Sequence, residues 1–406
     1  MKVTMVIPSY WGRESRIGWQ KGDAIYDHPI PLDHEGTLLR AIESIKILQD
    51  KDFQLAIIAV PTTKDIDTEV EAKVETIIKS VSNDVGVDIL LFGPSHLEKI
   101  HDIFFRNGKE DYTDILELRG YSNIRNLCLF IPHILNSDIS VLIDDDEVFE
   151  DKEFMSKAKE HIGNDFEGKP VLAVAGYYLQ KDGGYLVKSD SDEWTKSWKK
   201  NEKMNEGFRN YIGTGARLKV TPFVFGGNMV IHRDIYMNVP FDPNVTRGED
   251  IDFLMNAKMF GYNFYLDNQL SIKHLPPPKT HPIWRRLRED IYRFIYQRAK
   301  IESQKDIEGM TRVYPKDFDP YPGYFFKSDL DEIIETSCKM LSEQYLDEDD
   351  KVASKETLRN ITLAKTEANP QFNPFEKMCN FQKRWQKMME FVDNNDIRKN
   401  IQKILI

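Results

Sequence analysis

The first 280 residues alternate apolar runs rich in β-branched side chains with amphipathic segments of helical period, and this alternation constrains the fold more than any other feature. Such a pattern is typical of a largely parallel sheet whose strands are joined by crossover helices. We expect strands at residues 3–9, 54–60, 87–93, 139–143, 171–179, 221–232 and 264–274. We expect helices at residues 37–48, 68–81, 124–135 and 248–261. The prediction is an α/β domain over residues 1–282.

The pattern changes after the proline run at residues 276–278. Residues 283–406 show helical periodicity and few strand signals, with helices expected at 284–301, 328–346 and 375–392. We therefore place a boundary near residue 282 and expect a helical C-terminal region. Its expected role is to pack on the first domain, to form a homodimer interface or to help bind an acceptor.

Two long stretches, residues 11–36 and 181–219, resist the alternating pattern and are predicted to be loops. Loops of this length in a compact α/β domain are usually functional or disordered. Their tryptophans, at positions 11, 19, 194 and 198, favour lids over floppy tails.

Composition narrows the range of partners and compartments. The net charge of −11 argues against a nucleic-acid partner, because phosphate binding needs a basic surface. No apolar run approaches the roughly 20 residues that cross a bilayer, so no transmembrane segment is expected. Three widely spaced cysteines are too few for a disulfide framework. We expect a cytoplasmic protein.

Asp144, Asp145 and Asp146 follow directly on an apolar strand. The carboxyl ends of parallel strands are where open α/β sheets bind ligands. Three adjacent negative charges repel one another, so a site of this kind is expected to hold a cation, and oxygen ligands favour Mg²⁺ or Mn²⁺. The alternative is a strand that ends in a solvated acidic turn.

Other motifs follow one another in a set order around these carboxylates. A Pro-containing turn (IPSY, 7–10) ends the first predicted strand, and GYSNIRN (120–126) opens a later helix. After the three aspartates come a Gly-Gly turn before a strand (FGGNMVI, 225–231), an acidic helix start (RGEDIDF, 247–253) and finally His274. In this order the chain resembles the GT-A glycosyltransferases. Its GED…His ending is similar to that of polypeptide N-acetylgalactosaminyltransferases and β-1,4-galactosyltransferases, and its front half resembles family-two-like enzymes.

The resemblance implies a GT-A fold, a Rossmann-like mixed sheet flanked by helices, and a UDP- or GDP-sugar as donor. It implies that Asp146 and His274 hold Mn²⁺ or Mg²⁺, a Lewis acid that would neutralise the departing diphosphate. Asp144 would contact the ribose or the donor sugar. The further donor-binding residues on this basis are Pro8, Ser9, Tyr10, Gly120, Asn123, Arg125, Asn126, Asp145, Gly226, Gly227 and Asn228.

Each motif also has a structural explanation that the sequence leaves open. His274 could be a buried histidine whose ring nitrogens are hydrogen-bonded within the core. Arg125 and Asn126 could belong to a surface capping segment, and the Gly226–Gly227 pair could form a β-bulge.

The resemblance gives Asp250, beside Glu249, the role of base that takes the proton from the acceptor hydroxyl in inverting members. Both acids open a predicted helix, where the helix dipole favours negative charge, so a capping role is the alternative. Asp252 is a second candidate base. In the long loop near the N-terminus, Arg13, Arg16 and His28 could meet an anionic acceptor or a donor phosphate.

We therefore expect a metal-dependent glycosyltransferase that moves a hexose to a hydroxyl group of a small molecule or short glycan, with inversion. A nucleotidyltransferase that makes a nucleotide sugar is one alternative, although no Gly-rich loop with a basic residue follows the first strand. A non-catalytic GT-A-like binding module is the other.

Overall fold

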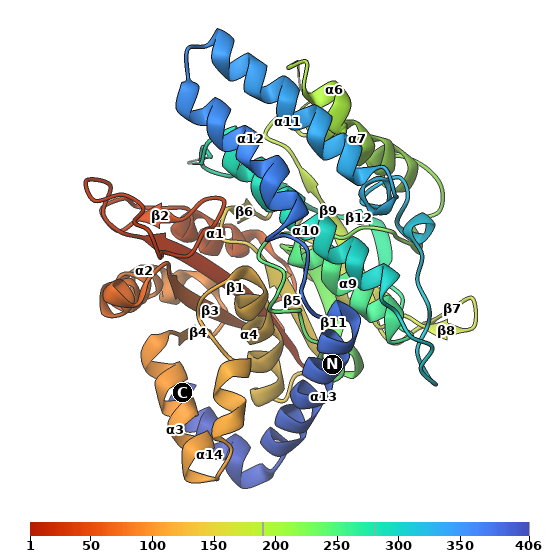
Figure 1. The fold of residues 1–406 in the computed structure, drawn as a ribbon. Coiled ribbons are helices and arrows are strands. Elements are labelled where there is room, and N and C mark those ends of the chain that lie inside the picture. Colours follow the sequence, from red (N-terminus) through yellow and green to blue (C-terminus); the bar gives the residue numbers. More distant parts are fainter. Residues whose placement is uncertain (189–190, 280, 406) are drawn as a thin grey trace.

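The computed structural model describes residues 1–188, 191–279 and 281–405. Its centre is a ten-stranded mixed sheet in the order β10-β12-β9-β11-β5-β1-β3-β4, with β2 beside β1 and β6 beside β12 (Figure 1). The strands on the main path are β1 (Val3–Gly12), β3 (Gln54–Pro61), β4 (Ile89–Phe92), β5 (Ile139–Ile143), β9 (Ala173–Leu179), β10 (Leu218–Val220), β11 (Asn228–His232) and β12 (Tyr265–His274). The short strands are β2 (Ile30–Pro31) and β6 (Glu147–Val148), and β7 (Asp165–Phe166) and β8 (Lys169–Pro170) form a separate pair.

The directions of the strands determine which strand ends lie together at one edge of the sheet. Strands β4, β3, β1 and β5 are mutually parallel, and β11 runs antiparallel to both β5 and β9. Strand β9 therefore runs in the direction of β5, and β12 is parallel to β9. The carboxyl ends of β1, β5, β9 and β12 lie at the same edge, together with the amino end of β11. The predicted class, α/β with a mixed sheet flanked by helices, is confirmed.

Two apolar layers enclose the sheet. One face is covered by α1 (Leu38–Ser44), α2 (Asp67–Val85) and α5 (Phe154–Glu160), whose buried side chains form one core cluster with the strands. The other face is covered by α3 (Pro94–Arg106), α4 (Tyr121–Ile134) and α9 (Glu249–Met259). Figure 1 shows α2 and α4 on opposite sides of the strands. Helix α4 is buried almost throughout, as its apolar sequence requires.

The first strand is longer than predicted. The turn expected at residues 7–10 does not exist, because β1 continues to Gly12 and pairs with β3 from Thr4 to Trp11. Its pairing with β5 ends at Val6. Pro8, which has no N–H group to donate, thus lies where β1 has lost one of its two neighbours, and proline is tolerated at such positions.

The stretch predicted as a loop at 181–219 contains two helices, α6 (Thr195–Trp198) and α7 (Lys200–Tyr211). Trp198 is buried against Phe294 and Phe325, so it anchors this stretch to the rest of the molecule. Trp11 is also fully buried. The lid role expected for these two tryptophans is therefore wrong.

The residues after 282 form α10 (Ile283–Glu302), α11 (Leu330–Asp347), α12 (Lys351–Lys365), α13 (Pro374–Val392) and α14 (Asn395–Leu405). The helices predicted at 284–301, 328–346 and 375–392 are confirmed as α10, α11 and α13. Helices α13 and α14 pack against α4, and α14 also packs against α3, so the chain returns to the sheet-covering layer (Figure 1). Their buried side chains belong to the same core cluster as α3, α4 and α9.

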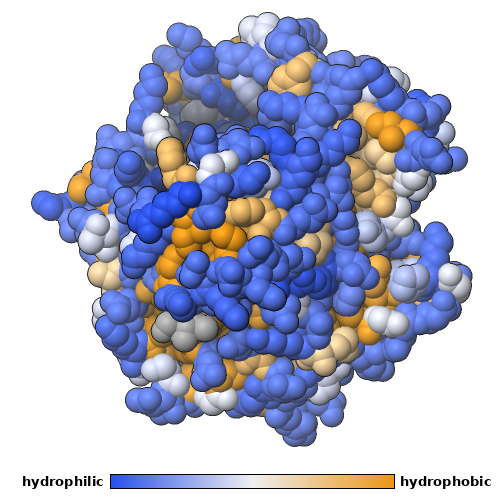
Figure 2. All heavy atoms as spheres, turned by 90° about the horizontal axis from the view of Figure 1, so that it is seen from below, coloured by the Kyte–Doolittle hydropathy of each residue, from blue (hydrophilic) through white to orange (hydrophobic). Residues whose placement is uncertain are grey.

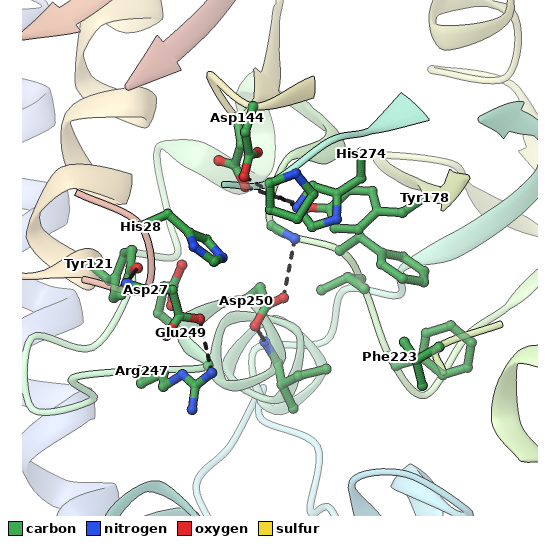
Figure 3. A pocket seen from close by; sticks show the side chains of 18 of the residues that line it. Asp27, His28, Tyr121, Asp144, Tyr178, Phe223, Arg247, Glu249, Asp250 and His274 are labelled. Carbon is green, nitrogen blue, oxygen red and sulfur yellow. Dashed lines mark hydrogen bonds and ion pairs between the residues drawn. The ribbon is translucent and has the colours of Figure 1, made fainter. Parts of the chain in front are cut away.

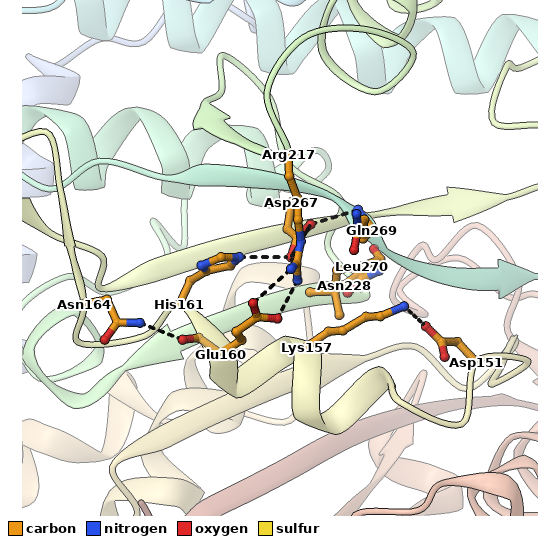
Figure 4. A network of polar contacts seen from close by, with 10 residues as sticks. All are labelled: Asp151, Lys157, Glu160, His161, Asn164, Arg217, Asn228, Asp267, Gln269 and Leu270. Carbon is orange, nitrogen blue, oxygen red and sulfur yellow. Dashed lines mark hydrogen bonds and ion pairs between the residues drawn. The ribbon is translucent and has the colours of Figure 1, made fainter.

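Strand β12 contains an irregularity that sets the position of its end. Its register against β9 shifts between Leu266 and Ser271. Figure 4 shows a polar network here, in which the Arg217 guanidinium donates to both carboxylate oxygens of the fully buried Asp267 and to Glu160. The amide nitrogen of Asn228 donates to the Leu270 carbonyl at 3.1 Å. These contacts fix the β-bulge from which β12 runs on to its carboxyl end.

Close approach at the same place requires a glycine in the neighbouring strand. A Cβ atom on Gly176 would lie 2.1 Å from the Leu270 carbonyl oxygen. A residue without a side chain is needed wherever two backbones meet this closely.

The face of the molecule seen from below in Figure 2, over α3, α13 and α14, is mainly hydrophilic with interspersed apolar patches. Within the described residues, no helix has both the length and the apolar character to cross a bilayer. The three cysteines are free and buried.

Candidate active site

A cavity of about 450 Å³ opens at the sheet edge where the carboxyl ends of β1, β5, β9 and β12 meet. Its lining includes nine of the sequence-predicted site residues: Tyr10, Arg125, Asp144, Asp145, Asp146, Gly226, Glu249, Asp250 and His274. They come from six separate segments of the chain. Figure 3 shows Asp144 and His274 on one side of this cavity, Arg247 on the opposite side, and His28 and Asp250 between them.

Asp146 and His274 are in contact although 128 positions separate them in the sequence (274 minus 146). His274 Nε2 lies 3.4 Å from Asp146 Oδ2. The backbone holds the two together, because His274 pairs with Glu147 between β12 and β6 and the Leu275 N–H donates to the Asp146 carbonyl. The ring of His274 also stacks on Tyr178 of β9, with ring centroids 4.7 Å apart.

Arg125 links the acids of β5 to the start of α9. Its Nη2 donates to Asp144 Oδ1 at 2.7 Å and its Nε donates to Glu249 Oε1 at 3.2 Å. The side chain is only 4% exposed, and its Nη1 has no partner among the described residues. Burial opposes the charge of this guanidinium, but Asp144, Tyr10 and Glu249 outweigh burial and raise its pKa. Arg125 is therefore a fixed cation at the base of the cavity.

Asp145 faces the sheet more than the cavity. The Ser9 hydroxyl donates to Asp145 Oδ2 at 2.6 Å, and the Trp11 indole N–H donates to the same hydroxyl oxygen at 2.9 Å. Burial, followed by the charge of Asp146, raises the pKa of Asp145 to about 8. This carboxyl holds β1 against the end of β5.

Asp250 and Asp252 occupy opposite environments on α9. Asp250 lines the cavity, where its Oδ2 accepts from the Gly226 N–H at 3.2 Å, and burial raises its pKa. Asp252 is fully buried in an ion pair with Lys300 at 2.8 Å. Asp252 cannot reach an acceptor, so the structure removes the second candidate base.

Glu249 combines its contact to Arg125 with strong burial. Burial, and then the neighbouring charge of Asp250, raise the pKa of Glu249 to about 7. Both acids line the cavity, but Glu249 accepts from the Arg125 guanidinium, whereas Asp250 accepts from the backbone N–H groups of Gly226 and Ile251.

Seven predicted site residues do not line the cavity. Asn126 exchanges hydrogen bonds with the backbone of Phe241, and Asn123 donates to the Arg119 carbonyl. Asn228 instead clamps the bulge of β12 (Figure 4). Gly120 donates its N–H to the Tyr26 hydroxyl. The others are Pro8 and Ser9, inside β1, and Gly227.

Gly227 does not line the cavity, but it packs directly against two of the acids that follow β5. A Cβ atom on it would lie 2.2 Å from Glu147 Oε1 and 2.7 Å from the Asp144 carboxyl carbon. Its N–H donates to the Tyr178 hydroxyl at 2.8 Å. Only glycine permits this approach between the start of β11 and the acids that follow β5.

Sequence reasoning missed several groups. Glu147 is fully buried beside Asp144 and Asp146, and burial followed by the Asp144 charge raises its pKa well above the usual range. Its position directly after the three aspartates was a usable signal. The cavity is also lined by Tyr26, Asp27, Tyr121, Tyr178, Lys200, Arg247, Lys279, Arg293 and Tyr321. Lys200, Arg293 and Tyr321 come from segments with no motif, so no local signal pointed to them.

The long N-terminal loop contributes His28 but not its arginines. His28 lines the cavity, and burial lowers its pKa. Arg13 is tied to Asp23 and Asp65, and Arg16 pairs with Glu14 at the surface. The expectation that these two arginines face a substrate is therefore wrong for this arrangement.

The donor set suits a hard divalent cation that also binds a ligand. Within the described ranges, no group of three or more His, Cys, Asp or Glu side chains is arranged to hold a metal by itself. Asp146 and His274 supply one oxygen and one nitrogen donor. Mg²⁺ and Mn²⁺ sites often use one or two protein ligands and complete the shell with substrate phosphates and water. The residues present fit such a shared site.

No family model matches the chain, and no curated protein matches it. Among solved structures it is similar to the mannosyltransferase PcManGT from Pyrobaculum calidifontis in complex with GDP-Man and Mn²⁺, at 13% identity and a TM-score of 0.46, over 97% of this chain and 87% of that one. A mycobacterial protein gives 15% identity, a TM-score of 0.40 and 72% coverage of each chain. GalNAc-T7 with UDP, GalNAc and Mn²⁺ gives 12% identity and a TM-score of 0.37, over 91% of this chain and 58% of that one.

Proposed function

We propose that this protein is a metal-dependent glycosyltransferase of the GT-A type, which transfers a hexose from a UDP- or GDP-sugar to a hydroxyl acceptor. The observation that carries the proposal is the contact between Asp146 and His274 in one cavity with Arg125 and Asp250. A carboxylate and an imidazole from distant strands meet at the edge where α/β sheets bind ligands. The motif order across residues 1–280 supports the same assignment.

Asp146 and His274 would hold Mn²⁺ or Mg²⁺, and the bound cation would stabilise the charge that develops on the leaving diphosphate. The chain's own residues set the geometry around it. Tyr178 orients the His274 ring by stacking, and Arg125 holds Asp144 in place. Glu147, buried behind the aspartates, accepts the Asp144 backbone N–H at 3.0 Å and so fixes the turn after β5.

Asp250 is the proposed base. In the reaction, an acceptor hydroxyl oxygen forms a bond to the anomeric carbon while the bond from that carbon to the diphosphate oxygen breaks. The electron pair leaves with the diphosphate, and the acceptor proton passes to Asp250. Burial raises the pKa of Asp250, which makes its carboxylate a better proton acceptor. A direct displacement inverts the configuration of the sugar.

We further propose that residues 1–282 form the catalytic unit and that residues 283–406 complete its pocket. Arg293 and Tyr321, from the second part, line the cavity. The homodimer and the cytoplasmic location stay predictions.

The experiment is a panel of nucleotide sugars tested for thermal stabilisation of the full chain with Mn²⁺ present, because a ligand that binds the folded state raises its melting temperature. The best donor is then assayed for release of nucleoside diphosphate. Asp146→Asn should abolish both signals, whereas Asp151→Asn, in an ion pair with Lys157 outside the cavity, should keep them. Pyrophosphate formed from a nucleoside triphosphate and a sugar phosphate would instead identify a nucleotidyltransferase. Anomeric analysis of the product by NMR tests inversion, and net retention would remove Asp250 from the base role.

A further inference from the structure

The cavity has two oppositely charged sides. The acidic side consists of Asp144, Asp145 and Asp146 with His274. Across the cavity lies a cationic side made of Lys200 on α7, Arg247 before α9, Lys279 after β12 and Arg293 on α10. Figure 3 shows Arg247 facing the acidic side with Asp250 between them.

The cations outnumber the carboxylates that hold them. Asp290 is shared by three of them, at 2.7 Å from Lys200 Nζ, 3.0 Å from Arg293 Nη2 and 3.4 Å from Arg247 Nη1. Asp27 adds one contact to Arg247, at 2.9 Å. Burial lowers the pKa of Lys200 to about 7. Arg247, Lys279 and Arg293 are therefore the fixed cations, and against the two carboxylates they leave a surplus of one positive charge.

Two of the cations retain free donors. Lys279 forms no hydrogen bond or ion pair within the described part of the chain, and its side chain is exposed. Arg293 is 6% exposed, and its Nε is buried without a partner among the described residues. Leaving a buried charged donor such as Arg293 Nε without a partner costs free energy, and an anionic ligand in the cavity would supply the missing acceptor.

The position of Asp250 determines which of the two substrates contacts the cationic side of the cavity. As the proposed base, Asp250 must touch the hydroxyl of the acceptor, whereas the diphosphate of the donor belongs with the cation held at Asp146 and His274. Because Asp250 lies between the two sides, the acceptor extends away from the acidic side and onto the cationic side. Burial raises the pKa of Asp250, and the Ile251 N–H and the charges of Arg293 and Arg125 offset only part of that rise.

We propose that the cationic side binds an anionic group, a phosphate ester or a carboxylate, carried by the acceptor. The acceptor is then a hydroxylated anion rather than a neutral sugar. The assignment of this anion to the acceptor rests on the proposed function, but anion binding itself can be measured without any transfer reaction.

Three matched probes separate the sources of the anion: glycerol 3-phosphate, glycerate and neutral glycerol. Each is titrated against the full chain, by thermal stabilisation and calorimetry, with UDP or GDP and Mn²⁺ present. We expect one or both anions to bind and glycerol to give no signal. Glycerol 3-phosphate as the tighter ligand identifies a phosphate ester, and glycerate as the tighter ligand identifies a carboxylate.

Variants locate the site. Lys279→Gln and Lys200→Gln should each weaken anion binding about tenfold, the effect of one lost charge-assisted hydrogen bond. Lys203→Gln is the matched control, since Lys203 lies on the same helix but pairs with Glu206 outside the cavity. Because Lys279 is exposed and without a described partner, its replacement leaves folding intact and keeps the test valid if Lys200→Gln is unstable.

Three results would overturn the proposal. The first is that glycerol binds as tightly as the anions, and the second is that Lys279→Gln leaves the anion affinity unchanged. The third is that the same variants lose about tenfold in affinity for UDP or GDP. The last result would assign the cations to the donor. Asp146→Asn distinguishes the two proposals, because it should remove nucleotide binding with Mn²⁺ and leave anion binding in place. If the wild type binds anions but no nucleotide, the glycosyltransferase assignment fails and the anion site stands.

Discussion

Replacing Lys300 by methionine tests how the helix that carries Asp250 is held in place. Lys300 Nζ on α10 lies 2.8 Å from Asp242 and 2.8 Å from Asp252 of α9, and all three side chains have no solvent exposure. It also donates to Asn256 at 3.2 Å. Methionine keeps the length of the side chain and removes its charge, so the variant leaves two buried carboxylates without a counterion.

The expected cost is large. Breaking a buried ion pair by removing one partner costs about 3–5 kcal/mol, against a total stability of about 5–15 kcal/mol for a typical protein. Lys305→Met is the matched control three residues beyond the end of α10. Lys305 pairs with Glu376 while its side chain stays 63% exposed, and a pair of this kind contributes less than about 1 kcal/mol.

Urea unfolding followed by circular dichroism measures both variants at pH 8 and pH 5. Burial raises the pKa of Asp252 even beside Lys300, and loss of the cation raises it further. A carboxyl whose folded pKa exceeds its unfolded value of about 4 destabilises the fold above that range, and the penalty fades as pH falls toward 4. Lys300→Met should therefore lose more stability at pH 8 than at pH 5. Equal unfolding midpoints for the two variants, or a loss that grows at pH 5, would refute the reasoning.

Three further changes have defined outcomes. Asp267→Asn removes the carboxylate charge that lies 2.8 Å from Arg217, and should lower the free energy of unfolding by about 2 kcal/mol in urea titrations. Because the bulge determines the path of β12 toward His274, the Mn²⁺ affinity, measured by calorimetry with nucleotide present, should fall as well. An unchanged Mn²⁺ affinity would show that the bulge does not position the site. Gly176→Ala places a methyl group 2.1 Å from the Leu270 carbonyl oxygen and should lower the melting temperature by several degrees. Gly12→Ala is the control, because its methyl group would meet nothing nearer than 3.8 Å, and it should leave the melting temperature almost unchanged. Burial raises the pKa of the Cys128 thiol to about 12, so the native protein should resist thiol reagents at pH 8 and react after unfolding in guanidinium; rapid labelling of Cys128 in the native state would contradict its burial.

Much of the fold was accessible from the sequence because local pattern and tertiary environment agree. The run before Asp144 is apolar throughout and forms the fully buried β5, and α9 begins at Glu249 as the acidic motif predicts. The meeting of Asp146 with His274 follows from topology, since both residues lie at carboxyl ends on one edge of the sheet.

Other features depend on contacts that no local pattern encodes. Proline usually favours a turn, but Pro8 lies beyond Val6, where the pairing of β1 with β5 ends, so its missing N–H group is tolerated inside β1. Asn228 follows a glycine pair that suggests a ligand site, yet its amide is used by the carbonyl of Leu270, which only the bulge brings within reach. The sequence carries no sign that Lys200, from a predicted loop, would donate to the carboxylate of Asp290, 90 positions away.

Helices α13 and α14 return to cover α3 and α4, so the protein has one apolar interior on that face rather than two. Detachment of α13 and α14 would expose side chains of α3 and α4 in the layer that also includes α9, the helix that carries Asp250. Heat or denaturant should therefore dismantle both regions in a single cooperative step. A ligand that binds the pocket should therefore also stabilise α13 and α14, whose residues do not line it.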